Sequence, residues 1–182
     1  KDPVSSVNVD EIVALGASLY AAYKGDQSKL SATQKSSIKK IKVSESTAMC
    51  FGTLALNYDE NRQDTSLSVS ILIEKNEKIP CSVTKSFVTS HDGQEIINCR
   101  ITESKSSETD PRFVNILFEE RLSLPSNRPA GQEIQITYSF DDNQTMHASF
   151  LDVESKKETK TSLSIIQVSD DSSNKIDKFI VE

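Results

Sequence analysis

The two histidines, His91 and His147, are the side chains best suited to general acid–base or nucleophilic catalysis near neutral pH. His91 lies beside a predicted turn at Asp92-Gly93, and His147 lies on the polar face of a predicted strand. No serine or cysteine motif places a nucleophile beside either ring. The five glycines are scattered, so there is no glycine-rich phosphate loop. We therefore interpret both histidines as solvent-accessible and expect no catalytic residue.

Thiol side chains can bind metal ions, and paired carboxylates can share a proton in catalysis. The spacing of these residues in the sequence argues against a metal site and against a catalytic carboxylate pair. Cys50, Cys81 and Cys99 are far apart in the sequence and form no C-x-x-C pair, so we expect no structural metal site. Their odd number favours reduced thiols in a cytosol-like compartment. Adjacent carboxylates such as Asp141-Asp142 are interpreted as turn charges rather than as a catalytic pair.

Charge and hydropathy exclude two classes of partner. The net charge is −6 at pH 7, whereas nucleic-acid binding requires a basic face. No apolar run approaches the roughly 18–20 residues that span a bilayer, so we expect no membrane segment. The 182 residues are enough for one domain with appended segments. The polar start at Lys1 has no signal-peptide pattern, and we expect the sequence to be a piece of a longer protein.

A helix is predicted near the start of the chain, at residues 9–24. Asn8 and Glu11 have the spacing of a capping box. The polar residues 26–46 that follow are predicted as a linker, partly extended near residues 38–43. The apolar residues that recur at helical spacing are Ile12, Leu15, Leu19 and Tyr23.

From about residue 47 the apolar residues alternate with polar ones, which is typical of strands with one buried face. Turn residues such as Asp92-Gly93 and Asp110-Pro111 separate these segments. Roughly eight short strands predict a mainly β fold, an antiparallel two-sheet β-sandwich preceded by a short N-terminal α-helix. Residues 169–182 have the capping and apolar spacing of a further helix. The alternating residues include Leu67, Val69, Ile71 and Ile73; Ile97, Cys99 and Ile101; Ile134, Ile136, Tyr138 and Phe140; and Met146, Ala148 and Phe150.

Several stretches of the chain match, in order, those of a known family. NVDEIVALGAS at 8–18 resembles N-P-D-E-A-V-A-x-G-A, and KNEKIP at 75–80 is similar to K-N-T-T-I-P. KSFVTSHDGQEIINCRI at 85–101 looks like Q-x-F-x-T-x-x-D-N-Q-x-x-V-x-I-x-V. IQITYSFDDNQTMHASFLD at 134–152 is similar to I-E-V-T-F-D-I-D-A-D-G-I-L-x-V-S-A-x-D. Over nearly its whole length the chain resembles the DnaK-type (Hsp70) molecular chaperones.

The resemblance implies a division of the chain into four segments. Residues 1–25 would be the last helix of an ATPase domain, and residues 26–46 would be an interdomain linker. Residues 47–168 would form a peptide-binding β-sandwich, and residues 169–182 would begin a lid helix.

The resemblance also implies that the sandwich holds extended hydrophobic segments of unfolded polypeptides. A central pocket would take one large apolar side chain, and an arch would cross above the bound peptide. The residues at these positions are Phe87, Ile97 and Cys99 for the pocket, Leu56 and Ser90 near the arch, and Thr53 below the peptide. Without the resemblance to the family, we would interpret Phe87, Ile97 and Cys99 as core residues on the buried face of a strand.

Two regions depart from the family pattern. The linker segment IKVSES at 41–46, which contains Val43, Ser44 and Glu45, is polar where the family has an aliphatic run that couples nucleotide state to peptide release. NYDENRQDTS at 57–66 is predicted as an expanded loop in place of a short Gly-Gly arch, and Ala130 stands where the family has arginine. An alternative interpretation is therefore a degenerate chaperone-like scaffold that binds one dedicated protein partner.

The resemblance implies that the longer parent chain is a cytoplasmic, stress-responsive chaperone that binds and hydrolyses ATP with Mg²⁺. A J-domain cochaperone and a nucleotide exchange factor would be its partners. This segment by itself is expected to bind no cofactor, metal ion or nucleic acid, and to hydrolyse no ATP.

Overall fold

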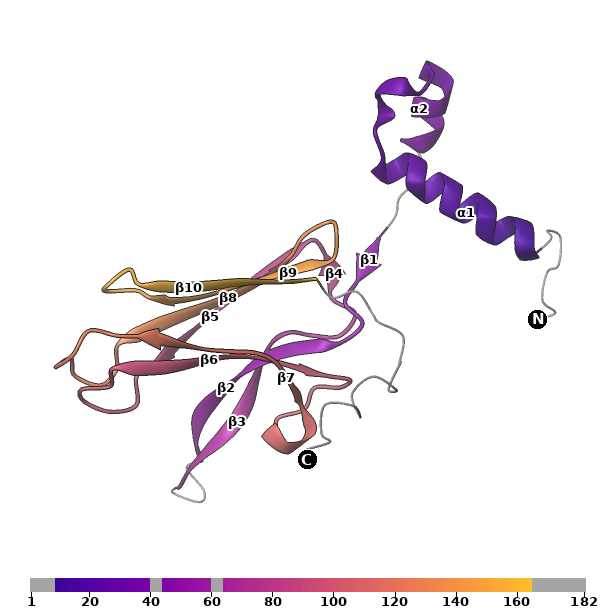
Figure 1. Cartoon of the computed structure of the whole chain (residues 1–182). Helices are drawn as coiled ribbons and strands as arrows, with labels where there is room; N and C mark the ends of the chain where they lie inside the picture. The colour runs from indigo at the N-terminus through magenta and orange to yellow at the C-terminus, as the bar shows by residue number, and fades with distance from the viewer. Residues whose placement is uncertain (1–8, 40–43, 60–63, 165–182) are drawn as a thin grey trace, which may run out of the picture. The chain divides into compact units, whose positions relative to one another are not determined.

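The computed structural model describes residues 9–39, 44–59 and 64–164. The chain divides into two compact units, residues 1–44 and 45–182, and Figure 1 labels the elements of each. Among the described residues, no helix is long and apolar enough to cross a membrane.

The described part of the first unit contains two α-helices where the sequence predicted one. α1 spans Val9–Lys24, which are the predicted bounds. The 3-10 helix η1, Gln27–Lys29, and α2, Ala32–Ile38, lie in the region predicted as a linker. The region predicted as a linker, partly extended near residues 38–43, thus includes helix that the sequence analysis did not identify.

A complete capping box explains α2. The Gln34 backbone N–H donates to Ser31 Oγ at 3.3 Å, and the Ser31 backbone N–H donates to Gln34 Oε1 at 2.9 Å. Ile38 at the end of the helix is buried. The Ser-x-x-Gln spacing was the signal in the sequence, and the high polar content of the region obscured it. Of the predicted linker end, Val43 lies outside the described residues and Ser44 is exposed.

The second unit is an antiparallel β-sandwich, as predicted. One four-stranded sheet has the order β3-β2-β6-β7, and the other has the order β10-β9-β8-β5. The strands β1 and β4 form a separate two-stranded antiparallel sheet. The strands are β1 Glu45–Ser46, β2 Cys50–Asp59, β3 Asp64–Ile73, β4 Lys78–Ile79, β5 Cys81–Val88, β6 Ile96–Ser104, β7 Asn115–Ser123, β8 Glu133–Phe140, β9 Thr145–Asp152 and β10 Glu158–Ser164; the 3-10 helix η2 is Pro111–Phe113.

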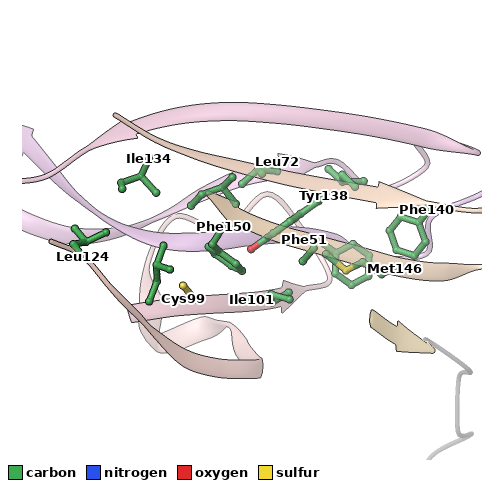
Figure 2. Close-up of a cluster of buried hydrophobic side chains, with 14 residues drawn as sticks. Phe51, Leu72, Cys99, Ile101, Leu124, Ile134, Tyr138, Phe140, Met146 and Phe150 are labelled. Atoms are coloured by element: carbon green, nitrogen blue, oxygen red, sulfur yellow. The ribbon is translucent and has the colours of Figure 1, made fainter. Parts of the chain in front are cut away.

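The core lies between the two sheets and follows the predicted period of two (Figure 2). Every second residue of β8 and β9 is buried, because successive side chains of a strand point to opposite faces. Aromatic rings join the two sheets: the ring centroids of Phe51 on β2 and Phe140 on β8 are 5.3 Å apart. Tyr138 and Phe150 pack edge to face at 6.2 Å within the second sheet.

The β2–β3 hairpin is longer than predicted. Residues 57–66 were expected to form an expanded loop, but Asn57 pairs with Ser66, Tyr58 with Thr65, and Asp59 with Asp64. This prediction is wrong because apolar and β-favouring side chains continue to alternate past Leu56 despite the charged residues nearby. Residues 60–63 and the predicted helix at 169–182 lie outside the described residues.

Candidate functional site

The strands β2 and β6 separate partway along their length. They pair only at Cys50–Ser104, Phe51–Glu103 and Gly52–Thr102. Beyond Gly52, β2 continues to pair with β3, and β6 pairs with β7 as far as Ile96, so the two hairpins diverge (Figure 1). Within the described residues, the facing edges of residues 53–59 and 96–101 have no strand partner. Such edges offer backbone N–H and C=O groups to an added strand.

Register irregularities on both sides explain why the strands separate there. The β2–β3 register shifts between Phe51 and Gly52, and the β6–β7 register shifts between Ile101 and Thr102. Both shifts adjoin the last β2–β6 pair, and such bulges bend a strand and increase its twist. Gly52 is suited to this point because a Cβ atom there would lie 2.7 Å from the Ser70 carbonyl oxygen.

A cavity of about 530 Å³ lies at this separation, within the range of known ligand pockets. Side chains of β2, β3, β5, β6 and β8 line it. Its inner part is apolar, with Phe87, Ile97, Ile134 and Ile136 among the lining residues. Phe87 and Ile97 are half-buried and pack against the main core cluster. The cavity therefore extends from the core of the sandwich to its surface.

The structure brings most of the predicted site residues to this one cavity. The residues that line it are Thr53, Leu56, Phe87, Ser90 and Ile97. Cys99 is the exception: its side chain is fully buried in the core cluster, and it is not among the residues that line the cavity. It shares the inward face of β6 with Ile97 but lies nearer the point where β2 and β6 pair, where the second sheet covers it. Burial raises the pKa of the Cys99 thiol to about 12, so the thiol stays protonated near neutral pH.

Two hydroxyl groups contact the backbone where β2 and β6 stop pairing, and one of them belongs to Thr53, which lines the cavity. Thr53, which is 1% exposed, donates from Oγ1 to the Arg100 carbonyl at 2.9 Å. The Tyr138 hydroxyl lies 3.0 Å from the Gly52 carbonyl oxygen and 3.2 Å from that of Arg100. These carbonyls belong to the residues where β2 and β6 stop pairing, so the hydroxyls replace strand hydrogen bonds. Burial also raises the pKa of Tyr138, which keeps its hydroxyl a donor.

Tyr138→Phe is expected to lower the free energy of unfolding by about 1–3 kcal/mol, because the buried Gly52 carbonyl oxygen loses its hydroxyl donor, whereas the Arg100 carbonyl keeps the hydrogen bond from Thr53 Oγ1. Urea denaturation measures this loss. Tyr58→Phe is the matched control, since Tyr58 is 59% exposed and should lose almost nothing. Equal losses in the two variants would show that the Tyr138 hydroxyl does not stabilise the separation of the strands.

A partly buried ion pair supports the rim of the cavity. Arg128 contacts Asp152 at 2.5 Å and Glu154 at 2.8 Å, with side-chain exposures of 14% for Arg128 and 0% for Asp152. The Arg128 carbonyl accepts from the Gly93 backbone N–H at 2.8 Å, and the Ala130 N–H donates to Asp92 Oδ1 at 2.7 Å. Arg128 therefore anchors the segment that holds the loop carrying Ser90. No local pattern predicts this pair, because Arg128 and Asp152 are 24 residues apart in the sequence.

The stability that Arg128 provides is expected to depend on pH. The hydrogen bond from Arg128 holds the pKa of Asp152 below its ordinary value of 3.8. A carboxyl group with a lowered pKa in the folded state stabilises the fold above its unfolded pKa, and this contribution is lost as the pH falls through the folded pKa. The difference in unfolding free energy between wild type and Arg128→Ala should thus shrink between pH 6 and pH 3 in urea titrations. A difference that is constant over this range would contradict the coupling.

Neither histidine lines the cavity, but the exposed His91 has its Nδ1 3.0 Å from the Oγ atom of Ser90, which does. His147 Nδ1 is 2.8 Å from Ser162 Oγ, and His147 Nε2 is 3.4 Å from Asp141 Oδ2, so a Ser–His–Asp contact exists on β9 and β10. His147 and Ser162 are exposed, as predicted for the polar face of a strand. An exposed position does not exclude water, so these contacts are those of surface polar groups. Among the described residues, no group of three or more His, Cys, Asp or Glu side chains could hold a metal ion.

Comparison with known proteins identifies the family. The family model described as Hsp70 protein matches residues 1–182. The chain is 24% identical over 164 residues to the protein named Chaperone protein DnaK of Stenotrophomonas maltophilia (strain R551-3). That match covers 90% of this chain and 22% of DnaK, so the chain spans about a fifth of the length of this relative. The chain belongs to the Hsp70 family.

Proposed function

We propose that residues 45–164 form a peptide-binding domain that holds extended, apolar segments of unfolded polypeptides, the activity of a molecular chaperone. The observation that carries the proposal is the separation of β2 from β6 around an apolar cavity. Membership of the Hsp70 family supports it. A pocket lined by apolar side chains and flanked by free strand edges suits a ligand that is itself an extended chain.

Binding would combine two kinds of contact. The edges of β2 and β6 would pair with the backbone of the peptide, which gives affinity without sequence selection. One large apolar side chain of the peptide would enter the space beside Phe87 and Ile97. Burying such a side chain contributes roughly 1.5–3 kcal/mol. The domain would therefore select segments that are both extended and apolar, which are exposed in unfolded proteins.

The roles of the longer protein belong to the same proposal. If the parent chain is a chaperone like the relative named DnaK, we expect it to bind ATP with Mg²⁺ and to be cytoplasmic. We also expect it to work with a J-domain cochaperone and a nucleotide exchange factor. The coupling role of the linker end stays a prediction: Glu45 lies in β1, opposite Ile79 of β4, and its Oε2 accepts from Gln144 at 3.1 Å.

A scaffold for one dedicated partner is the second candidate. The length of the β2–β3 hairpin favours it, because Leu56, Tyr58 and Leu67 are exposed there. Affinity capture distinguishes the two functions: a chaperone retains many unrelated unfolded proteins, whereas a scaffold enriches a single folded one.

Fluorescence anisotropy tests the proposed function. A labelled heptapeptide with a central leucine among small polar residues should bind saturably in the micromolar range. The same peptide with aspartate in place of leucine should not bind, because Arg100 is the one cation among the described residues that line the cavity, and Glu119 already contacts it at 2.6 Å. Equal binding of both peptides, or of neither, would contradict the proposal.

A further inference from the structure

Strand β7 is an open edge of its sheet. It pairs with β6 on one side, and no described strand pairs with its other side. At the opposite edge, on β3, the Val69 N–H donates to the Thr109 carbonyl at 2.8 Å. The Ile71 carbonyl on that edge accepts from Lys85 Nζ at 2.5 Å. Backbone groups of the β3 edge are therefore partly covered, whereas β7 can accept a further strand.

Large apolar side chains are exposed at the start of β7. Ile116 and Leu117 are 50% and 38% exposed, and Phe113, just before the strand, is 66% exposed. In the described part of residues 45–182, every other large exposed apolar residue lines the peptide cavity. β7 also contains neither proline nor lysine, the residues that commonly prevent an edge from pairing. Its composition thus favours contact with another strand.

The direction of the hydrogen bonds shows which backbone groups of β7 are available. The Leu124 N–H, one residue beyond the strand, donates to the Glu95 carbonyl at 2.8 Å and so points towards β6. This direction alternates along an antiparallel pair. The N–H and C=O groups of Glu119, Arg121 and Ser123 therefore point away from β6 and face the open edge.

The charges on this edge are complementary to those of a second copy. Arg121 is exposed, and within the described residues its side chain has no hydrogen-bond or ion-pair partner. Glu119, two residues earlier on the same face, contacts Arg100 of β6 at 2.6 Å. When two β7 strands pair antiparallel with Glu119 opposite Arg121, the available backbone groups meet and two interchain ion pairs form. The side chains across the interface then alternate in charge.

We propose that two copies of this chain associate through their β7 edges, with Glu119 of each copy opposite Arg121 of the other. Phe118 then lies opposite Leu122, and a two-fold axis passes beside Glu120. The two Glu120 carboxylates approach each other at this axis, a like-charge contact that weakens the dimer and identifies the register. The interface lies outside the peptide cavity, so the inference does not depend on the proposed function.

Sedimentation velocity of the whole chain over micromolar to millimolar concentrations tests the dimer. Arg121→Glu should weaken association at least about tenfold, because it replaces two ion pairs with two like-charge contacts. Glu120→Gln should strengthen association about threefold, because it removes the repulsion at the axis. The matched control is Lys160→Glu on the edge strand β10, which changes the net charge as Arg121→Glu does and should leave association unchanged.

Each other outcome overturns the dimer. Wild type that stays monomeric at millimolar concentration, or a dimer that persists unweakened in Arg121→Glu, excludes this interface. Equal weakening by Arg121→Glu and Lys160→Glu attributes the effect to net charge, and Glu120→Gln without a gain excludes the register.

Hydrogen exchange locates the contact within the strand. The amides of Glu119, Arg121 and Ser123 should exchange more slowly as the protein concentration rises. If they respond instead to added peptide, with no dependence on protein concentration, the edge binds a peptide and the dimer is overturned. Anisotropy of the labelled heptapeptide should be the same for Arg121→Glu and wild type, so the proposed function is tested separately.

Discussion

Replacing Ile97 with phenylalanine is expected to weaken the binding of an apolar heptapeptide at least about tenfold, which corresponds to roughly 1.4 kcal/mol. Ile97 is half-buried on β6 and lines the inner part of the cavity together with Phe87. The larger ring would occupy the space that we propose for the apolar side chain of the peptide. The cavity gives the ring room, so the free energy of unfolding should fall by less than about 1.5 kcal/mol.

Anisotropy titration and urea denaturation measure the two quantities on the same preparation. Ile116→Phe is the matched control: Ile116 is 50% exposed on β7 and does not line the cavity, so peptide affinity should not change. Unchanged peptide affinity in Ile97→Phe, with a large loss of stability, would show that Ile97 belongs to the core and that the pocket is misplaced.

Arg128→Ala is expected to have the largest effect on stability, a loss of about 3–5 kcal/mol at pH 7. The variant leaves the carboxylate of Asp152, which is fully buried, without its cationic partner. Of the contacts with Asp152, a hydrogen bond from the Ser155 hydroxyl would remain, and it does not replace a positive charge. The loop carrying Ser90 should also loosen, because Arg128 anchors the segment to which it is bonded.

The matched control is Arg112→Ala. Arg112 contacts Asp110 at 2.6 Å, but the Arg112 side chain is 81% exposed, and surface pairs of this kind contribute about 0–1 kcal/mol. Urea denaturation of both variants gives the comparison. A loss in Arg128→Ala no greater than that in Arg112→Ala would show that the buried pair does not stabilise the rim.

Local patterns in the sequence predicted much of the fold and part of the site. The helix at 9–24 and the alternating strands β8 and β9 could be predicted because their signals are periodic and lie within a few residues of each other. α2 had a local signal, the spacing of Ser31 and Gln34, and could also have been found. The extension of the β2–β3 hairpin was obscured by charged residues between its strands.

The contacts that shape the cavity could not be predicted from the sequence, because they join distant residues. Tyr138 contacts the Gly52 carbonyl across 86 residues, and the separation of β2 from β6 depends on register shifts in two different hairpins. Cys99 shows the same limit. Alternation places it on the inward face of β6, but only the packing of the second sheet decides that it is core while Ile97 lines the cavity.

Hydrogen exchange of the backbone amides tests most directly whether a peptide binds between the separated strands. With a saturating apolar peptide, amides at alternate positions of residues 53–58 on β2 and 96–101 on β6 should exchange more slowly, because they gain a hydrogen-bonding strand. The free edge of β7, residues 115–123, should be unchanged. Slower exchange along β7 alone, or no change along β2 and β6 despite bound peptide, would contradict the account.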